Sequence, residues 1–174
     1  MRIILSLLIF LSACNSGPKK DTVSFKDLEP LQGNWSGVQD VLAADDTTWT
    51  NYKTTLVITA LKDSLQLDFS LSQSAEEEIK EIGILYIHED GKKMNFGPSE
   101  YTIDSVKRGK DYLVITAIKE DVDNDKQADI RLTIGIRPGS ISRYSRIVTI
   151  RREVKYKGTE MFFTRIVLGV GKEK

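Results

Sequence analysis

Residues 129–137 read Asp-Ile-Arg-Leu-Thr-Ile-Gly-Ile-Arg, and this stretch decides the fold class. Every second residue from Ile130 to Ile136 is a large aliphatic, whereas the residues between them are charged, polar or glycine. A period of two is typical of a β-strand with one buried face, because successive side chains of a strand point to opposite sides. The turn-forming run Pro138-Gly139-Ser140 then ends the strand.

The same alternation continues along most of the chain, and no long amphipathic helical pattern interrupts it. We expect further strands, separated by short turns, over residues 52–60, 65–71, 82–86, 92–96, 101–106, 112–118, 141–156 and 159–170. About eight to ten short antiparallel strands predict an all-β fold, either a sandwich or a closed barrel. We favour a single up-and-down β-barrel, because closure removes the free edges along which a sheet can pair with other chains.

The start of the domain carries a motif of its own. A short helical turn is predicted before Gly33-Asn34-Trp35, which begins the first strand. This Gly-x-Trp resembles the opening motif of the lipocalins. In that family the tryptophan closes one end of the barrel and an arginine of the last strand packs across it. The resemblance therefore implies these barrel-closing roles for Trp35 and Arg165; it covers the two ends of the domain and not the middle motif of the family.

A short apolar run, Ile3 to Phe10, follows Arg2 and leads into Leu11-Ser12-Ala13-Cys14. The run has the layout of a secretory signal and is too short to span a bilayer. Its ending resembles the lipobox of bacterial lipoproteins, which implies cleavage before Cys14 and lipidation of that cysteine. The alternatives are an ordinary signal peptide with an incidental cysteine, or a buried N-terminal strand.

The resemblance to lipoproteins divides the chain into three parts. Residues 1–13 are the expected signal peptide, residues 14–27 a lipidated cysteine with a flexible polar tether, and residues 28–174 the lipocalin-like barrel. The lipid on Cys14 would anchor the chain in the bacterial cell envelope. Asn15 is not the aspartate that marks inner-membrane retention in some bacteria, so we expect the outer membrane.

Charge and cysteine content exclude several functions. The chain has 25 basic and 25 acidic residues, so it lacks the positive field of a nucleic-acid-binding protein. Cys14 is the only cysteine, and its acylation would leave no thiol for a disulfide, a metal site or nucleophilic catalysis.

Four aspartates recur at short intervals in residues 121–130, a segment that we expect to join two strands. Alternate residues of a tightly wound loop can direct several carboxylates at one cation, and calcium needs six or more oxygen ligands. The run is similar to the aspartate-rich loops of calcium-binding hairpins, although Lys126 stands where those loops carry glycine. Calcium is therefore the one cofactor that the sequence suggests, and an acidic, solvated hairpin is the alternative. The expected ligands are Asp121, Asp123, Asp125 and Asp129.

Two arginines share the apolar register of the long strand predicted over residues 141–156. Tyr144, Arg146 and Arg152 have the same parity as Val148 and Ile150, which predicts that they face the interior. There the guanidinium groups would pair with the carboxylate or phosphate of a ligand. The alternatives are a β-bulge that reverses the register, or strand-end positions that reach solvent.

No catalytic constellation is found in the sequence, and the sole histidine, His88, has no neighbours that suggest one. We therefore expect a non-enzymatic protein that binds or carries a small, mainly apolar or acidic ligand in the barrel. The alternative is an envelope interaction module with a filled barrel, whose loops around Trp49 dock onto a partner protein.

Overall fold

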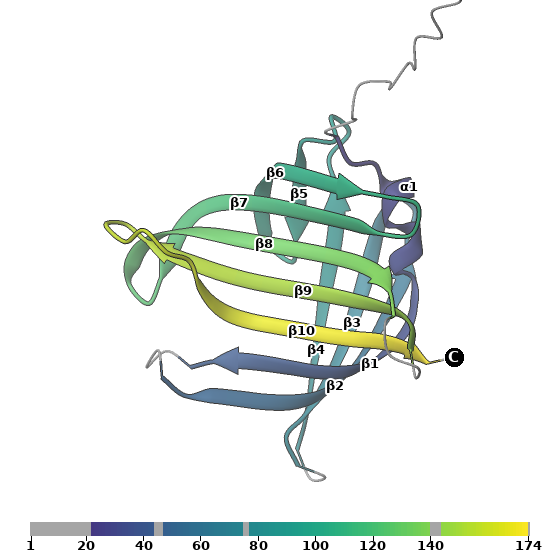
Figure 1. Cartoon of the computed structure of the whole chain (residues 1–174), viewed down its shortest axis with the longest axis horizontal. Helices are drawn as coiled ribbons and strands as arrows, with labels where there is room; N and C mark the ends of the chain where they lie inside the picture. The colour runs from purple at the N-terminus through teal and green to yellow at the C-terminus, as the bar shows by residue number, and fades with distance from the viewer. Residues whose placement is uncertain (1–21, 44–46, 75–76, 140–143, 174) are drawn as a thin grey trace, which may run out of the picture.

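The computed structural model describes residues 22–43, 47–74, 77–139 and 144–173. Within these residues it contains ten β-strands and a short helical segment before the first of them (Figure 1). The strands are β1 (Gly33–Leu42), β2 (Trp49–Ala60), β3 (Ser64–Ser72), β4 (Glu78–Ile87), β5 (Lys93–Phe96), β6 (Ser99–Arg108), β7 (Leu113–Asp123), β8 (Lys126–Pro138), β9 (Tyr144–Tyr156) and β10 (Phe163–Glu173).

Each strand pairs antiparallel with its neighbours in the sequence, and β1 also pairs with β10. This last ladder, from Ser36 opposite Gly171 to Val41 opposite Ile166, closes the sheet into a barrel. The predicted up-and-down β-barrel is therefore confirmed, and the alternative of a sandwich is excluded. Closure satisfies the backbone groups that an open sheet would leave unpaired along its two outer strands.

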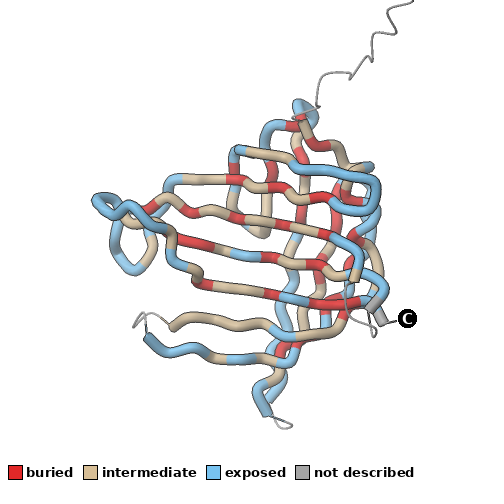
Figure 2. Tube along the Cα trace, in the orientation of Figure 1, coloured by how far each residue is buried: buried red, intermediate tan, exposed pale blue. Residues whose placement is uncertain are grey.

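The apolar positions of the strands point inward, as their period of two requires. Those of β8, Ile130 to Ile136, are at most 3% exposed, whereas the residues between them are more accessible. Figure 2 shows this alternation of buried and accessible positions along β8. Burying one large aliphatic side chain stabilises the fold by about 1.5–3 kcal/mol. The interior strand faces therefore supply the core.

One end of the barrel is covered by the segment before β1, and we call it the closed end. It consists of α1 (Phe25–Leu28) and the single 3-10 turn η1 (Glu29–Leu31), which lie beside the turn between β6 and β7 (Figure 1). Leu28 and Leu31 are buried in the core, and the indole Nε1 of Trp35 donates a 2.8 Å hydrogen bond to the Leu31 carbonyl. Trp35 thus ties the covering segment to the first strand.

The ordered domain begins before the predicted boundary at Leu28. Val23 is 2% exposed, and its N–H donates a hydrogen bond to the Gly91 carbonyl. Phe25 packs against the core, and Ser24 and Asp27 form a capping box at α1. The predicted tether, residues 14–27, is therefore too long at its C-terminal end; residues 14–21 lie outside the described part of the chain.

The opposite end, which we call the open end, carries the β1–β2, β7–β8 and β9–β10 connections (Figure 1). The wall is also incomplete there on one side. The short β5 pairs only with Leu85–Ile87 of β4, so residues 78–83 of β4 have no strand partner on that side in the described sheet. Charged residues along this edge, Glu78, Lys80 and Glu81, oppose pairing with another chain.

Candidate functional site

The inner face of β7 changes from apolar to charged as the strand approaches the open end. Leu113, Ile115 and Ala117 are buried in the core. The next inward positions are Lys119, Asp121 and Asp123, because alternate residues share a face. The charged groups therefore line the interior at the open end and do not belong to a surface loop.

The acidic segment forms a two-residue hairpin, and this overturns the predicted loop. Asp123 pairs with Lys126, and only Asn124 and Asp125 lie between β7 and β8. Both have positive φ, 48° and 60°, the backbone of the hairpin turn that matches the twist of paired strands. Asparagine and aspartate tolerate this region better than other residues with a Cβ. The strands thus extend through the segment that we expected to wrap a cation.

The four aspartates consequently do not converge, and the predicted calcium site is not formed. Asp121 and Asp123 face inward and Asp125 is in the turn, whereas Asp129 lies on the outer face with Lys155 at 3.3 Å and Lys157 at 2.9 Å. In the described ranges no three metal-ligating side chains are placed to hold an ion. The hairpin register is the reason: Asp121 and Asp123 share the inner face of β7, whereas Asp129 lies between the inward residues Ala128 and Ile130 of β8 and therefore points outward.

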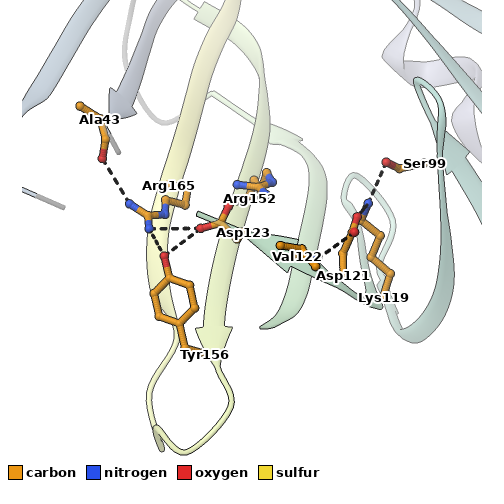
Figure 3. A network of polar contacts seen from close by, with 9 residues as sticks. All are labelled: Ala43, Ser99, Lys119, Asp121, Val122, Asp123, Arg152, Tyr156 and Arg165. Carbon is orange, nitrogen blue, oxygen red and sulfur yellow. Dashed lines mark hydrogen bonds and ion pairs between the residues drawn. The ribbon is translucent and has the colours of Figure 1, made fainter. Parts of the chain in front are cut away.

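Asp123 is the centre of a polar cluster that joins three strands (Figure 3). Its Oδ1 accepts a 2.9 Å hydrogen bond from Nη2 of Arg152, and its Oδ2 accepts a 2.9 Å bond from the Tyr156 hydroxyl. Nη2 of Arg165 lies 3.2 Å from the same Oδ2 and also donates to the Tyr156 hydroxyl. Nη1 of Arg165 donates to the Ala43 carbonyl at 3.3 Å. The cluster therefore connects β7, β9 and β10 to the residue that follows β1.

Burial and nearby positive charge shift the pKa of Asp123 in opposite directions. Burial raises the pKa of Asp123, but the hydrogen bonds from Arg152 and Tyr156 and the charges of Arg152 and Arg165 outweigh it and leave the pKa lowered. Burial also raises the pKa of Tyr156, and its hydrogen bond to the Asp123 carboxylate adds to that effect. At neutral pH the cluster therefore holds an ionised carboxylate between two guanidinium groups and a neutral phenol.

A second group of polar residues lies beside this cluster on β6 and β7. Lys119 is paired with Asp121, donates a 2.8 Å hydrogen bond to the Ser99 hydroxyl and lies 5.3 Å from the centre of the Tyr101 ring. Burial raises the pKa of Tyr101, and the nearby Arg152 charge opposes the rise. The inner wall at the open end thus presents ordered cations and phenols next to the apolar core.

The interior is accessible to solvent at this end. Residues directly opposite in a ladder share a face. Ile79, Asp121 and Phe163 therefore point inward, because they lie opposite the buried residues Leu71, Ala128 and Val154, respectively. Those inward partners are about half exposed: Ile79 46%, Asp121 45% (side chain) and Phe163 48%. An aliphatic, a carboxylate and an aromatic group on the inner face of the open end are therefore accessible to solvent.

The structure separates residues that the sequence analysis had grouped. Arg152 faces inward as predicted, but Arg146 is exposed at the closed end, near the start of β9. The two arginines do not form one site, because six residues of strand separate them by about 20 Å. The backbone of Tyr144 pairs with Glu173, whereas its side chain lies outside the described part of the chain.

Arg165 does not pack across Trp35, and that predicted contact is wrong. Trp35 lies at the closed end, whereas Arg165 precedes Ile166, which pairs with Val41 near the other end of β1. Both residues are buried, at 3% and 5% exposure, but in different ends of the barrel. A β-bulge between Thr164 and Ile166 contains Arg165. The arginine therefore closes the polar cluster and does not cover the tryptophan.

Sequence reasoning did not place Lys119, Tyr101 or Tyr156 in the site. The signal was present for Lys119, because the alternation of β7 continues past Ile118, where we expected the strand to end. Tyr156 lies on the same face of β9 as Val154. Its hydroxyl reaches Asp123 only because the hairpin pairs β7 with β8, which in turn pairs with β9. That proximity could not be read from spacing along the chain.

No family model matches the chain, and no curated protein matches it in sequence. The described helices, α1 and η1, are far too short to cross a lipid bilayer. The expected lipidation site Cys14 and the signal segment before it lie outside the described residues. The functional interpretation therefore rests on the barrel, on the residues at its two ends and on the sequence motif around Cys14.

Proposed function

We propose that the chain is a lipid-anchored lipoprotein of the bacterial outer membrane whose barrel binds a small, mainly apolar molecule without catalysing a reaction. The motif Leu11-Ser12-Ala13-Cys14 supports the anchor, with the lipid attached to Cys14. The barrel supports binding, because barrels of eight strands already hold one small ligand, and the interior widens with strand number. Its likeness to the lipocalins remains part of this proposal.

The observation that carries the proposal is the environment of Arg152. Its side chain is 28% exposed on the inner face, and among the described residues Asp123 is its only side-chain hydrogen-bond partner. A guanidinium group has five N–H donors, so most of them remain available to an acceptor that enters from the open end. A carboxylate fits this position, because arginine binds such groups through two parallel hydrogen bonds.

The surroundings of Arg152 indicate what the rest of the ligand should be. Buried Leu132 is its partner across the β8–β9 ladder, and buried Val154 is the next inward residue of β9. Phe163 borders the same side of the opening. An apolar body with one acidic end, such as a fatty acid, would place its chain on these groups and its carboxylate on Arg152.

Native mass spectrometry of the chain purified gently from its own cells tests whether such a ligand is carried. Titration with an amphipathic anion, 8-anilinonaphthalene-1-sulfonate, tests the site itself. We expect Arg152→Gln to weaken binding about tenfold or more, because hydrogen bonds to charged groups contribute about 1.5–3 kcal/mol. Arg151→Gln is the matched control, since Arg151 is adjacent but points outward. Equal affinity of the two variants would remove Arg152 from the site.

A second function, docking to an envelope protein, is favoured by exposed apolar side chains at the open end. Trp49 is 51% exposed at the start of β2, and Met161 is 71% exposed in the β9–β10 connection. Aromatic residues of this kind are frequent anchors of protein interfaces. If the purified chain carries no ligand and Arg152→Gln changes nothing, while Trp49→Ala abolishes co-purification of one defined envelope protein, docking is the better interpretation.

A further inference from the structure

A pocket of about 440 Å³ lies at the closed end, far from the polar cluster. It is bordered by α1 and η1 on one side and by the β6–β7 turn and the closed-end parts of β8 and β9 on the other. Its charged lining consists of Lys26, Asp27, Arg108, Lys110, Asp111 and Arg146. Four cations against two carboxylates give the pocket a positive excess.

The pairing within the pocket leaves this excess of positive charge on side chains other than Arg108. Asp27 is already engaged, because its Oδ2 accepts hydrogen bonds from the N–H and hydroxyl of Ser24, both at 2.8 Å, and its Oδ1 lies 3.5 Å from Nη1 of Arg108. By contrast, no described residue forms a hydrogen bond or an ion pair with the side chain of Lys26, Lys110 or Arg146. Asp111 likewise has no partner among the described residues, so three cations stand against one carboxylate there.

Arg108 is held in place at the edge of the pocket. Its Nη2 donates a 2.9 Å hydrogen bond to the Thr22 carbonyl, and its side chain remains 32% exposed. Pro30 and Tyr112 provide an apolar wall, and Tyr112 is 46% exposed. A fixed guanidinium, three cations without a described partner and an exposed phenol suit an anion that is attached to an apolar or glycerol-like body.

We propose that this pocket binds the phosphate group of an anionic phospholipid in the membrane that holds the chain. The position of the N-terminal segment identifies this occupant. Thr22 lies at the pocket through its bond to Arg108, and the chain from Cys14 to Thr22, eight residue-to-residue steps, reaches at most about 28 Å. An anchor on Cys14 would therefore keep the closed end close to the headgroups, where tyrosine side chains are also favoured.

This inference rests on the proposed lipid anchor, so the experiment separates the pocket from the anchor. The chain beginning at residue 14 and carrying Cys14→Ser has no lipid, and it retains every member of the described core, which runs from Val23 to Val170. Its binding is measured by surface plasmon resonance on captured vesicles of phosphatidylcholine alone, and of equal parts phosphatidylcholine and phosphatidylglycerol. Inorganic phosphate and glycerol 3-phosphate are titrated separately by calorimetry.

We expect binding to the anionic vesicles only. The substitutions Lys26→Gln, Lys110→Gln and Arg146→Gln are added one after another up to a triple variant, and the affinity for these vesicles should fall about fivefold with each cation removed. The combined variant Lys53→Gln, Lys80→Gln and Lys157→Gln removes equal charge from exposed sites away from the closed end, and it should bind as the parent does. Thermal melting checks that all variants fold.

Three outcomes would overturn the inference. Equal losses of vesicle affinity in the pocket triple variant and in the control triple variant would mean that net charge and not the pocket controls binding. Tight binding of glycerol 3-phosphate without vesicle binding would assign the pocket to a soluble phosphate. Equal binding to both vesicle types would remove the role of the phosphatidylglycerol charge. An unacylated Cys14 in the native chain, seen by mass spectrometry, would instead refute the anchor and leave the vesicle result to stand on its own.

Discussion

Asp123 is the residue on which the polar cluster depends, because it is the carboxylate between Arg152 and Arg165. We expect Asp123→Asn to lower the free energy of unfolding by about 2–3 kcal/mol, since Arg165, whose side chain is 6% exposed, would lose its paired charge. Asp129→Asn is the control on the outer face, and its loss should be much smaller. Urea denaturation measures both, and similar losses would show that the cluster adds no stability of its own.

The same carboxylate predicts a dependence on pH. A lowered pKa in the folded state means that the stability due to ionised Asp123 is complete above its ordinary pKa of 3.8 and is lost as the pH falls through the lowered value. The difference in stability between the parent chain and Asp123→Asn should therefore be constant near neutral pH and shrink in strong acid. Urea midpoints from about pH 7 to about pH 2 measure it. A difference that stays constant throughout would contradict the lowered pKa.

At the scale of the element, the ladder that closes the barrel depends on one glycine. A Cβ on Gly37 of β1 would collide with the Gly169 carbonyl and lie 2.8 Å from the Cα of Val170, both backbone atoms of β10. We expect Gly37→Ala to cost about 1–3 kcal/mol, since the two strands must move apart. A Cβ on Gly169 has no neighbour within 4 Å, so Gly169→Ala is the matched control. Chemical denaturation distinguishes them, and equal stabilities would show that the ladder adjusts freely.

The strands also show how far the sequence could be interpreted. The period of two in β8 and β9 placed their inner faces correctly, because burial of one face controls the pattern. The acidic segment was misjudged because spacing along the chain cannot distinguish a wound loop from two strands joined by Asn124-Asp125. The contacts of Arg152 with Asp123 and of Arg165 with Tyr156 depend on register between strands, which the alternation within one strand does not specify.

At the scale of the whole molecule, anchoring makes a simple prediction. If Cys14 carries the proposed lipid, the Cys14→Ser chain should move from the membrane fraction to the soluble fraction of lysed cells, because the acyl chains would be its attachment to the membrane. Ser16→Ala, which lies outside the lipobox-like motif, is the control and should stay with the membrane. Immunoblotting of the two fractions measures the distribution. A Cys14→Ser chain that stays membrane-bound would contradict anchoring through this residue.

The seam between β1 and β10 also determines the order in which the barrel can assemble. Ser36 and Gly171 pair across the seam although they stand near opposite ends of the described chain. Hairpins between successive strands can form locally and early, but this ladder must wait until its two distant partners meet, and contacts of that kind make folding slow. Until then the nascent sheet has two free edges. Refolding yield should consequently fall as the chain concentration rises, since intermolecular pairing competes with the final intramolecular step.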